Sequence, residues 1–294
     1  MTVSEKFHGL SAGRLPTNIH QAMETRMAGR LEGKIAIITG ASRGLGQYCA
    51  IEYAKEGAIV VVAARTEQVQ NPDLPGTIHD TVRMVEEAGS EAFPVVCNVA
   101  DTGSIQAMVD TVLDKYGRID ILMNNAAVQP PGFMNTIQPR HWELEFKINV
   151  HGPFHCSRAV LPAMTEQKSG NIINISSVAA DRMTSHYGAT KVAIEALTLG
   201  MAKDVEADGI AINALKPVGA IDTPGVRLGR APGQIGGDTP ANPMPPPDSY
   251  VEAAVLVAMQ TVETCTGGIF NDVEAVERFA DAETKKRLSA IKPA

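Results

Sequence analysis

The sequence predicts a single α/β domain, in which helices cover both faces of a mainly parallel, doubly wound sheet of about seven strands. Short β-branched runs alternate with helical stretches from residue 34 onward. The runs are apolar at every position, which is typical of parallel strands that are buried on both faces. The chain has 294 residues, of which 44% are hydrophobic and 20% are charged, so it can bury such a core.

Six apolar runs predict the strands, and they are residues 34–39, 58–63, 92–97, 120–124, 171–176 and 210–215. A short seventh strand is expected near Ile269. Helices are expected between the strands, over residues 45–56, 101–116 and about 249–260. Gly57 is a plausible stop for the first of these helices. Asp101 is a candidate cap for the second, because its carboxylate can accept from free N–H groups of the first turn.

Four segments lie outside this alternation. Residues 1–32 have no continuous apolar run and predict an N-terminal leader or arm before a domain over 33–271. Residues 66–77 form a long loop after the second strand. Residues 217–247 are rich in proline and glycine and follow the sixth strand, so they predict a substrate lid. Residues 272–294 predict a helical C-terminal tail, a candidate for packing on a neighbouring subunit.

Charge and composition exclude several classes of function. A formal net charge of -7 argues against a nucleic-acid partner, and no apolar run approaches the roughly 18 residues of a membrane span. His151 and His155 have the spacing of a metal pair, but Pro153 lies between them and no third ligand is evident, so no metal site is predicted. Free, buried thiols in a reducing, cytoplasmic compartment are expected for the four cysteines, Cys49, Cys97, Cys156 and Cys265.

A glycine-rich turn, Thr39-Gly-Ala-Ser-Arg-Gly-Leu-Gly46, joins the first predicted strand to the first helix. Its glycines allow a tight turn, close approach of a ligand and close packing of helix on strand. The free N–H groups at the helix N-terminus can bind a diphosphate, and the position between strand and helix is the context that a dinucleotide site requires. Six residues are therefore predicted to bind a dinucleotide: Gly40, Ser42, Arg43, Gly44, Leu45 and Gly46.

Five further motifs follow in order along the chain. They are Cys97-Asn98-Val99, Asn124-Asn125-Ala126-Ala127, Lys147-Ile-Asn149-Val, Ile175-Ser176-Ser177 and Tyr187-Gly-Ala-Thr-Lys191. With the G-x-x-x-G-x-G turn they resemble the short-chain dehydrogenase/reductase family over residues 32–223. The 66–77 loop and residues 216–221 look like its hydroxysteroid dehydrogenase-like branch. This resemblance implies a Rossmann-type fold, an oxidoreductase, and a homotetramer or homodimer.

The resemblance also implies a catalytic set of Asn149, Ser177, Tyr187 and Lys191. Tyr187 and Lys191 are four apart and share a helix face, so the ammonium is expected to lower the pKa of the phenol and make it a usable acid or base. Ser177 would donate to the substrate carbonyl oxygen, and Asn149 would hold a water that links Lys191 to solvent. Ser176 is the alternative serine, because adjacent strand residues point to opposite faces. The cofactor would also contact Asn98, Val99, Asn125, Tyr187, Lys191 and Ile221.

The end of the second strand favours NADP(H) over NAD(H). Ala64 stands where NAD-specific members carry an acid for the ribose 2′-hydroxyl. Arg65 follows it and Arg43 lies in the glycine-rich turn, so two guanidinium groups could hold a 2′-phosphate. The sequence therefore predicts an NADP(H)-dependent enzyme that interconverts a small-molecule carbonyl and a secondary alcohol. The alternatives are a 3-oxoacyl thioester reductase and, from another class, a non-catalytic nucleotide-binding scaffold.

Overall fold

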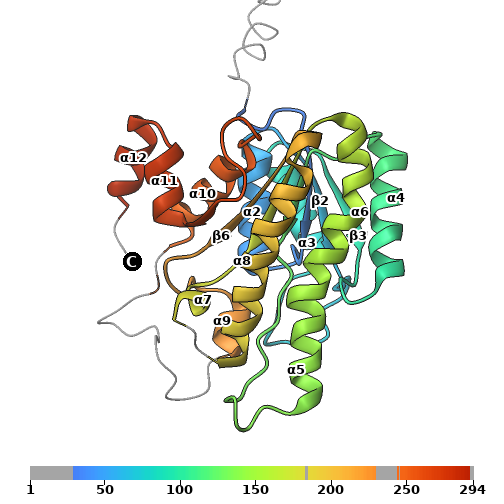
Figure 1. Ribbon diagram of the computed structural model, residues 1–294, viewed down its shortest axis with the longest axis vertical. Coiled ribbons are helices and arrows are strands. Elements are labelled where there is room, and N and C mark those ends of the chain that lie inside the picture. The colour runs from blue at the N-terminus through green and yellow to red at the C-terminus, as the bar shows by residue number, and fades with distance from the viewer. Residues whose placement is uncertain (1–28, 183–184, 230–243, 245, 292–294) are drawn as a thin grey trace, which may run out of the picture.

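The computed structural model describes residues 29–182, 185–229, 244 and 246–291. The predicted leader falls mostly on residues 1–28 and the predicted lid mostly on 230–245, so these two interpretations lie largely outside the described residues. Within the described part, the chain folds into a sheet with helices on both sides (Figure 1).

Seven strands form one sheet in the order β3-β2-β1-β4-β5-β6-β7, and every neighbouring pair is parallel. The prediction of a doubly wound parallel sheet is confirmed, and the strand limits agree to within about two residues. The strands are β1 (Ile35–Thr39), β2 (Ile59–Ala64), β3 (Ala92–Val96), β4 (Ile121–Asn124), β5 (Gly170–Ile175), β6 (Ile210–Lys216) and β7 (Ile269–Asn271).

The helices begin and end close to their predicted limits. As predicted, the Asp101 carboxylate accepts from the backbone N–H of Gly103, at 2.9 Å, and so caps α4. The α-helices are α2 (Gly44–Lys55), α3 (Ile78–Glu87), α4 (Thr102–Tyr116), α5 (Pro139–Phe146), α6 (Gly152–Gln167), α7 (Val178–Asp181), α8 (Ser185–Val205), α9 (Pro224–Gly229), α10 (Asp248–Ala258), α11 (Asp272–Phe279) and α12 (Ala282–Ser289). A π-helical segment (Lys147–His151) joins α5 to α6, and a 3-10 turn (Glu206–Asp208) follows α8.

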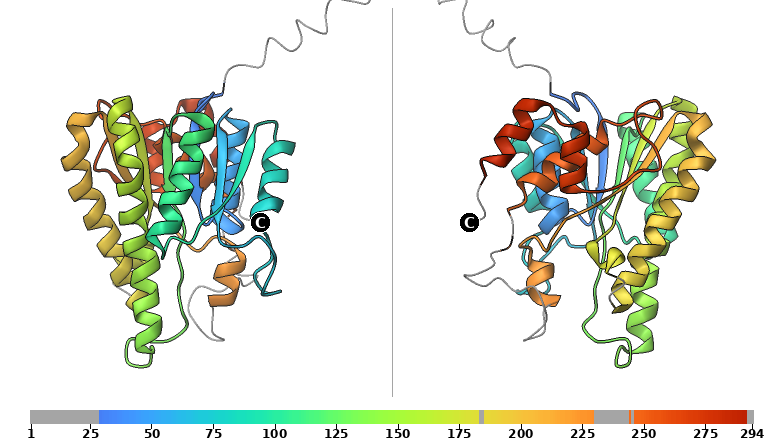
Figure 2. Two further views of the ribbon diagram at one scale, coloured as in Figure 1. Left: turned by 90° about the vertical axis from the view of Figure 1, so that its right-hand side faces the viewer. Right: turned by 60° about the vertical axis from the view of Figure 1, so that its left-hand side comes forward.

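Helices lie on both faces of the sheet (Figure 2), and an apolar layer separates them from it on each face. On one face α2, α3 and α10 pack against side chains such as Ile38 of β1, and on the other α4, α6 and α8 pack against its neighbour Ile37. Both isoleucines are fully buried, which explains why the strand runs are apolar at every position. No helix in the described ranges has the length and apolar character needed to cross a membrane.

The strand order determines where a ligand can bind. The chain leaves β1 toward β2 and β3 on one side and returns to β4 on the other, so loops on either side of β1 diverge at its carboxyl end. In open α/β sheets, ligands bind in the crevice at this switch point. The glycine-rich turn follows β1 directly and therefore lies at this point.

The C-terminal tail packs on its own chain. Leu288 of α12 contacts the core layer that contains α10. Glu252 of α10 has a side chain only 2% exposed and accepts from both Arg30 and Arg287, the latter at 2.6 Å. A buried carboxylate needs such partners, so these arginines hold α12 and the start of the domain against α10.

Candidate active site

The turn after β1 leaves room beside the backbone only because glycines occupy it. Gly40 has a φ of +66°, and a Cβ at this position would lie 2.8 Å from the backbone of Ala126. A Cβ on Gly46 would lie 2.5 Å from the side-chain nitrogen of Asn125. That nitrogen donates to the carbonyl oxygens of Thr39 and Gly40, at 2.8 and 3.2 Å, so Asn125 fixes the turn to the end of β4.

Arg43 fastens the long loop after β2. Its Nε and one terminal nitrogen donate to the carbonyl oxygens of Pro75 and Gly76, both at 2.9 Å. Ser42 beside it is 3% exposed, and a Cβ on Gly76 would lie 2.5 Å from its carbonyl oxygen. Burial, and then the nearby positive charge of Arg65, lower the pKa of Arg43. Two guanidinium groups therefore lie close together at the end of β2, and Arg65 is exposed to solvent.

The other predicted cofactor residues frame the same edge of the sheet. Asn98 follows β3, and its side-chain oxygen accepts from the N–H of Ala100 at 3.2 Å, which turns the chain. Val99 is 9% exposed and packs beside Gly152, where a Cβ would lie 3.2 Å from it. Leu45 is half-buried and contacts the core on the α2 side.

Asn149 connects three elements. It lies in the π-helical segment and is 1% exposed. Its oxygen accepts from the N–H of Val128, and its nitrogen donates to the Val128 carbonyl, both at 2.8 Å. The nitrogen also donates to Thr190 Oγ1 at 3.2 Å, and that hydroxyl donates to the carbonyl oxygen of Tyr187 at 2.8 Å. A π-bulge often marks a functional position in a helix, and here it contains Asn149.

Tyr187 and Lys191 share one face of α8, as the spacing predicts. The Lys191 ammonium lies 5.4 Å from the centre of the Tyr187 ring and donates to the carbonyl oxygen of Ile175 at 2.7 Å. Burial lowers the pKa of Lys191 to about 8. Burial, together with the negative charge of Glu145, raises the pKa of Tyr187 above its ordinary value. Burial thus opposes ionisation of the Tyr187 phenol, whereas a positive charge on the nearby ammonium favours it.

The two serines after β5 have different surroundings. Ser176 is 3% exposed and donates to Oε1 of Glu195 at 2.6 Å. Ser177 is half-buried and its hydroxyl accepts from the N–H of Ala179 at 3.2 Å, capping α7. The hydroxyl hydrogen of Ser177 is not used in that contact, which leaves Ser177 the more suitable donor to a ligand.

Comparison with known proteins identifies the family. The short chain dehydrogenase family matches residues 34–231, about two thirds of the chain. The chain belongs to this family. Members bind NAD(P)(H) and act on small-molecule carbonyl or alcohol substrates, so the protein is a nucleotide-binding oxidoreductase of the Rossmann type.

This short-chain dehydrogenase is similar in sequence to proteins of two different names. It is 32% identical over 198 residues to 3-oxoacyl-[acyl-carrier-protein] reductase FabG of Thermotoga maritima, covering 66% of this chain and 77% of the relative. It is 36% identical over 211 residues to human hydroxysteroid dehydrogenase-like protein 2, covering 70% of this chain and 50% of the relative. The Xenopus laevis protein of that name is 32% identical over 257 residues, which cover 85% of this chain and 59% of the relative. The chain thus spans about half the length of these latter relatives.

Solved structures agree with the fold. A 3-ketoacyl-(acyl-carrier-protein) reductase from Brucella melitensis, complexed with NADH, is 27% identical, with a TM-score of 0.70 over 82% of this chain and 97% of that one. A short-chain type dehydrogenase/reductase from Mycobacterium marinum is 28% identical, with a TM-score of 0.72 over 82% of this chain and 94% of that one.

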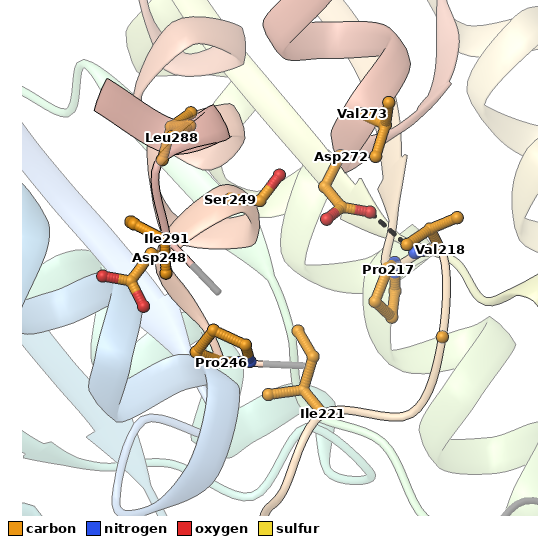
Figure 3. Close-up of a pocket in the computed structure, with 11 residues that line it drawn as sticks. Pro217, Val218, Ile221, Pro246, Asp248, Ser249, Asp272, Val273, Leu288 and Ile291 are labelled. Carbon is orange, nitrogen blue, oxygen red and sulfur yellow. Dashed lines mark hydrogen bonds between the residues drawn. The ribbon is translucent and has the colours of Figure 1, made fainter. Parts of the chain in front are cut away.

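A cavity of about 190 Å³ adjoins the segment after β6 (Figure 3). Its lining is mostly apolar, and the carboxylate of Asp272 accepts there from the N–H of Val218 at 2.6 Å. Leu288 and Ile291 of the tail form one wall. The lining includes Ile221, one of the predicted cofactor contacts, and none of the four predicted catalytic residues.

Sequence reasoning missed one buried pair beside the predicted catalytic residues. Nδ1 of His186 lies 2.6 Å from Oε2 of Glu145, and neither side chain is more than 1% exposed. Glu145 lies four residues before Asn149, and His186 directly precedes Tyr187. The sequence did offer one indication of this pair, because Glu145 is a charged residue one helical turn before the predicted catalytic Asn149. In the described part of the chain, no group of three or more His, Cys, Asp or Glu side chains could hold a metal ion.

Proposed function

We propose that this short-chain dehydrogenase is an NADP(H)-dependent enzyme that interconverts a carbonyl compound and a secondary alcohol, with Tyr187 as the acid and base. The observation that carries the proposal is the position of Lys191 on the same face of α8 as Tyr187, with its ammonium 5.4 Å from the centre of the Tyr187 ring. Asn149 is linked to this turn of α8 through Thr190, which donates to the backbone carbonyl oxygen of Tyr187. A nucleotide-binding scaffold would not require Asn149, Ser177, Tyr187 and Lys191 together, which favours an enzyme over that alternative.

The residues at the switch point fit the nucleotide. Gly40 and Gly46 allow the turn to pack closely against Ala126 and Asn125, at the N-terminal end of α2 where free N–H groups could bind a diphosphate. Arg43 and Arg65 lie close enough for one charge to act on the other, and no carboxylate forms an ion pair with either in the described residues. Two such cations favour a bound 2′-phosphate.

The bound nicotinamide would supply or accept the hydride. In the reductive direction, Tyr187 donates its phenolic proton to the carbonyl oxygen as the carbon–hydrogen bond forms, and Ser177 donates a hydrogen bond to the same oxygen. Lys191 holds positive charge near the phenol and offsets the burial that otherwise opposes its ionisation. In the oxidative direction, the phenolate of Tyr187 takes the hydroxyl proton.

Replacing the acid tests this proposal directly. Tyr187→Phe removes only the hydroxyl, so NADPH binding is expected to persist while turnover falls by about 10²–10⁴-fold. Tyr116→Phe is the matched control, because Tyr116 is a partly exposed tyrosine on α4 that donates to Glu91. The measurement is NADPH consumption with a panel of ketones, alongside a binding titration by NADPH fluorescence. A Tyr187→Phe enzyme with a third of the wild-type turnover would contradict the role.

A 3-oxoacyl thioester reductase is the second candidate. Two proteins that resemble this chain, from Thermotoga maritima and Brucella melitensis, carry such names. Including a 3-oxoacyl thioester in the same panel separates this activity from reduction of simple ketones. A preference of more than about tenfold in kcat/KM for the thioester would favour this second candidate.

Self-association and location are part of the proposal. Phe154 of α6, and Val192 and Leu199 of α8, are 37–45% exposed, and the two helices lie next to each other on one side of the molecule (Figures 1 and 2). Apolar side chains on neighbouring helices suit a symmetric contact, and we propose a homodimer or homotetramer through this face. The four cysteines are all free and buried, which suits a reducing, cytoplasmic compartment.

A further inference from the structure

A buried acid and base connect the predicted catalytic tyrosine to two other parts of the chain. His186, in the first turn of α8, has its Nδ1 2.6 Å from Oε2 of Glu145 in α5. Its other ring nitrogen, Nε2, lies 3.2 Å from the carbonyl oxygen of Gly132, in the loop between β4 and α5. The residue after His186 is Tyr187, so the imidazole fixes the start of α8 to both segments.

Hydrogen bonds at both ring nitrogens require the pair to share one proton. A hydrogen bond between Nε2 of His186 and the Gly132 carbonyl needs the hydrogen on Nε2, because the carbonyl has no hydrogen to give. The contact between Nδ1 and Glu145 then needs a second hydrogen, either on the imidazole or on the carboxyl. Both arrangements are neutral overall, and both hold one proton more than a neutral imidazole beside a carboxylate.

The surroundings favour keeping that proton. Oε1 of Glu145 is buried and has no hydrogen-bond partner in the described residues, and burial raises the pKa of this carboxyl. The titratable groups that face it from α8 are His186, Tyr187 and Lys191, and α5 carries His141 one turn earlier. The neighbouring π-helical segment carries Lys147 and His151, and the loop contributes the carbonyl oxygen of Gly132.

We propose that Glu145 and His186 are a positioning pair, whose shared proton keeps negative charge away from Tyr187 and whose contacts hold Tyr187 in register with the loop that carries Gly132. The inference rests on the proposed role of Tyr187 as acid and base. When the pair loses its proton at higher pH, the buried carboxylate makes the neighbouring phenol harder to ionise. The pair then opposes alcohol oxidation, which needs the phenolate.

Glu145→Gln tests the electrostatic part. The amide is isosteric, cannot ionise, and can donate to a neutral Nδ1, so the contact with His186 is kept. For oxidation of a secondary alcohol, kcat/KM should rise with pH as the Tyr187 phenol ionises, and this rise is the limb of the pH profile that we compare. We expect Glu145→Gln to move this limb toward lower pH by on the order of one unit. Glu143→Gln, at an exposed position on the same helix, should leave it unchanged.

Thermal unfolding gives a readout that needs no turnover. Above about pH 6.5 a separated histidine and glutamate hold no shared proton, whereas the folded pair does, so folding takes up a proton. The Tm of the wild type should therefore fall relative to Glu145→Gln as the pH rises from about 7 to 9, and Glu143→Gln should follow the wild type. Parallel Tm curves for the wild type and Glu145→Gln would overturn the shared proton.

The two measurements separate the possible failures. A wild type without turnover on any carbonyl or alcohol would contradict the proposed function, while the Tm comparison would still decide on the pair. Tm curves that diverge as expected, together with an unchanged kinetic limb, would overturn the link between the pair and Tyr187. A merely structural pair would lower kcat at every pH and would move neither the limb nor the slope of Tm with pH.

Discussion

Arg65→Ala is expected to weaken the use of NADPH much more than that of NADH. Two donors of Arg43 are already committed to the carbonyl oxygens of Pro75 and Gly76, whereas Arg65 is exposed at the end of β2. Arg65 is therefore the residue with most donors available for a 2′-phosphate. A hydrogen bond to a charged group contributes about 1.5–3 kcal/mol, which corresponds to about 10- to 150-fold in affinity.

Solvent exposure places Arg65 at the low end of that range. We expect Arg65→Ala to reduce kcat/KM for NADPH about tenfold and that for NADH less than about twofold, because NADH has no 2′-phosphate to lose. Salt should shrink the difference, since it screens exposed charges. Ala64→Asp should go further, because a carboxylate repels the phosphate and accepts from the ribose 2′-hydroxyl of NADH.

The assay is kcat/KM for both cofactors in the wild type and each variant, with the ketone held constant. Arg83→Ala is the control, because Arg83 is an exposed arginine on α3 that pairs with Asp80 and Glu87. If the wild type prefers NADH, or if Arg65→Ala harms both cofactors equally, the assignment of NADP(H) is wrong.

Three further predictions test burial, packing and association. Burial lowers the pKa of Lys191 to about 8, so the folded state gives up a proton between about pH 8 and 10.5 and gains stability there. Lys191→Met should therefore raise the free energy of unfolding most below pH 8, by up to about 3 kcal/mol. Its Tm should exceed that of the wild type by an amount that shrinks toward pH 10, and a Tm difference that is constant with pH would contradict this. Gly46→Ala should abolish NADPH binding in a fluorescence titration, because its Cβ would meet an amide nitrogen at 2.5 Å, whereas Gly200→Ala, with nothing within 4 Å, should bind normally. Val192→Glu should yield a smaller species than the wild type in light scattering, whereas Val69→Glu, at a 48% exposed loop position, should not; a monomeric wild type would refute the association.

The sheet could be predicted from sequence because its signal is local. Each strand is a short run of apolar residues, and α4 begins at Asp101, a capping residue whose preference does not depend on the rest of the fold. The same holds for the glycine-rich turn, where steric limits act within a few residues of Gly40. The strand order then determines the place of the candidate site, because it brings the end of β1 to the switch point.

Contacts between distant residues could not be predicted in this way. Arg43 is visible in the sequence as a cation near the nucleotide, but its hydrogen bonds to a loop 32 residues away depend on how that loop folds. Glu145 and His186 are 41 residues apart, and each alone is an ordinary polar residue on a helix. Their pairing needs α5 and α8 to pack together, which only the tertiary structure determines.

The C-terminal tail shows how a charged helix can be held by a buried charge. The segment over α12 is strongly polar, with Lys285, Lys286 and Arg287 in succession, so its sequence does not indicate a docking face. Besides the contact of Leu288 with the core, a buried carboxylate, Glu252 of α10, binds two arginines from opposite ends of the domain. Removing one arginine would leave the carboxylate partly unpaired in a buried site, which is costly. The negative charge of Glu252 therefore helps to hold the tail against α10. In this position the tail also forms a wall of the cavity beside Ile221.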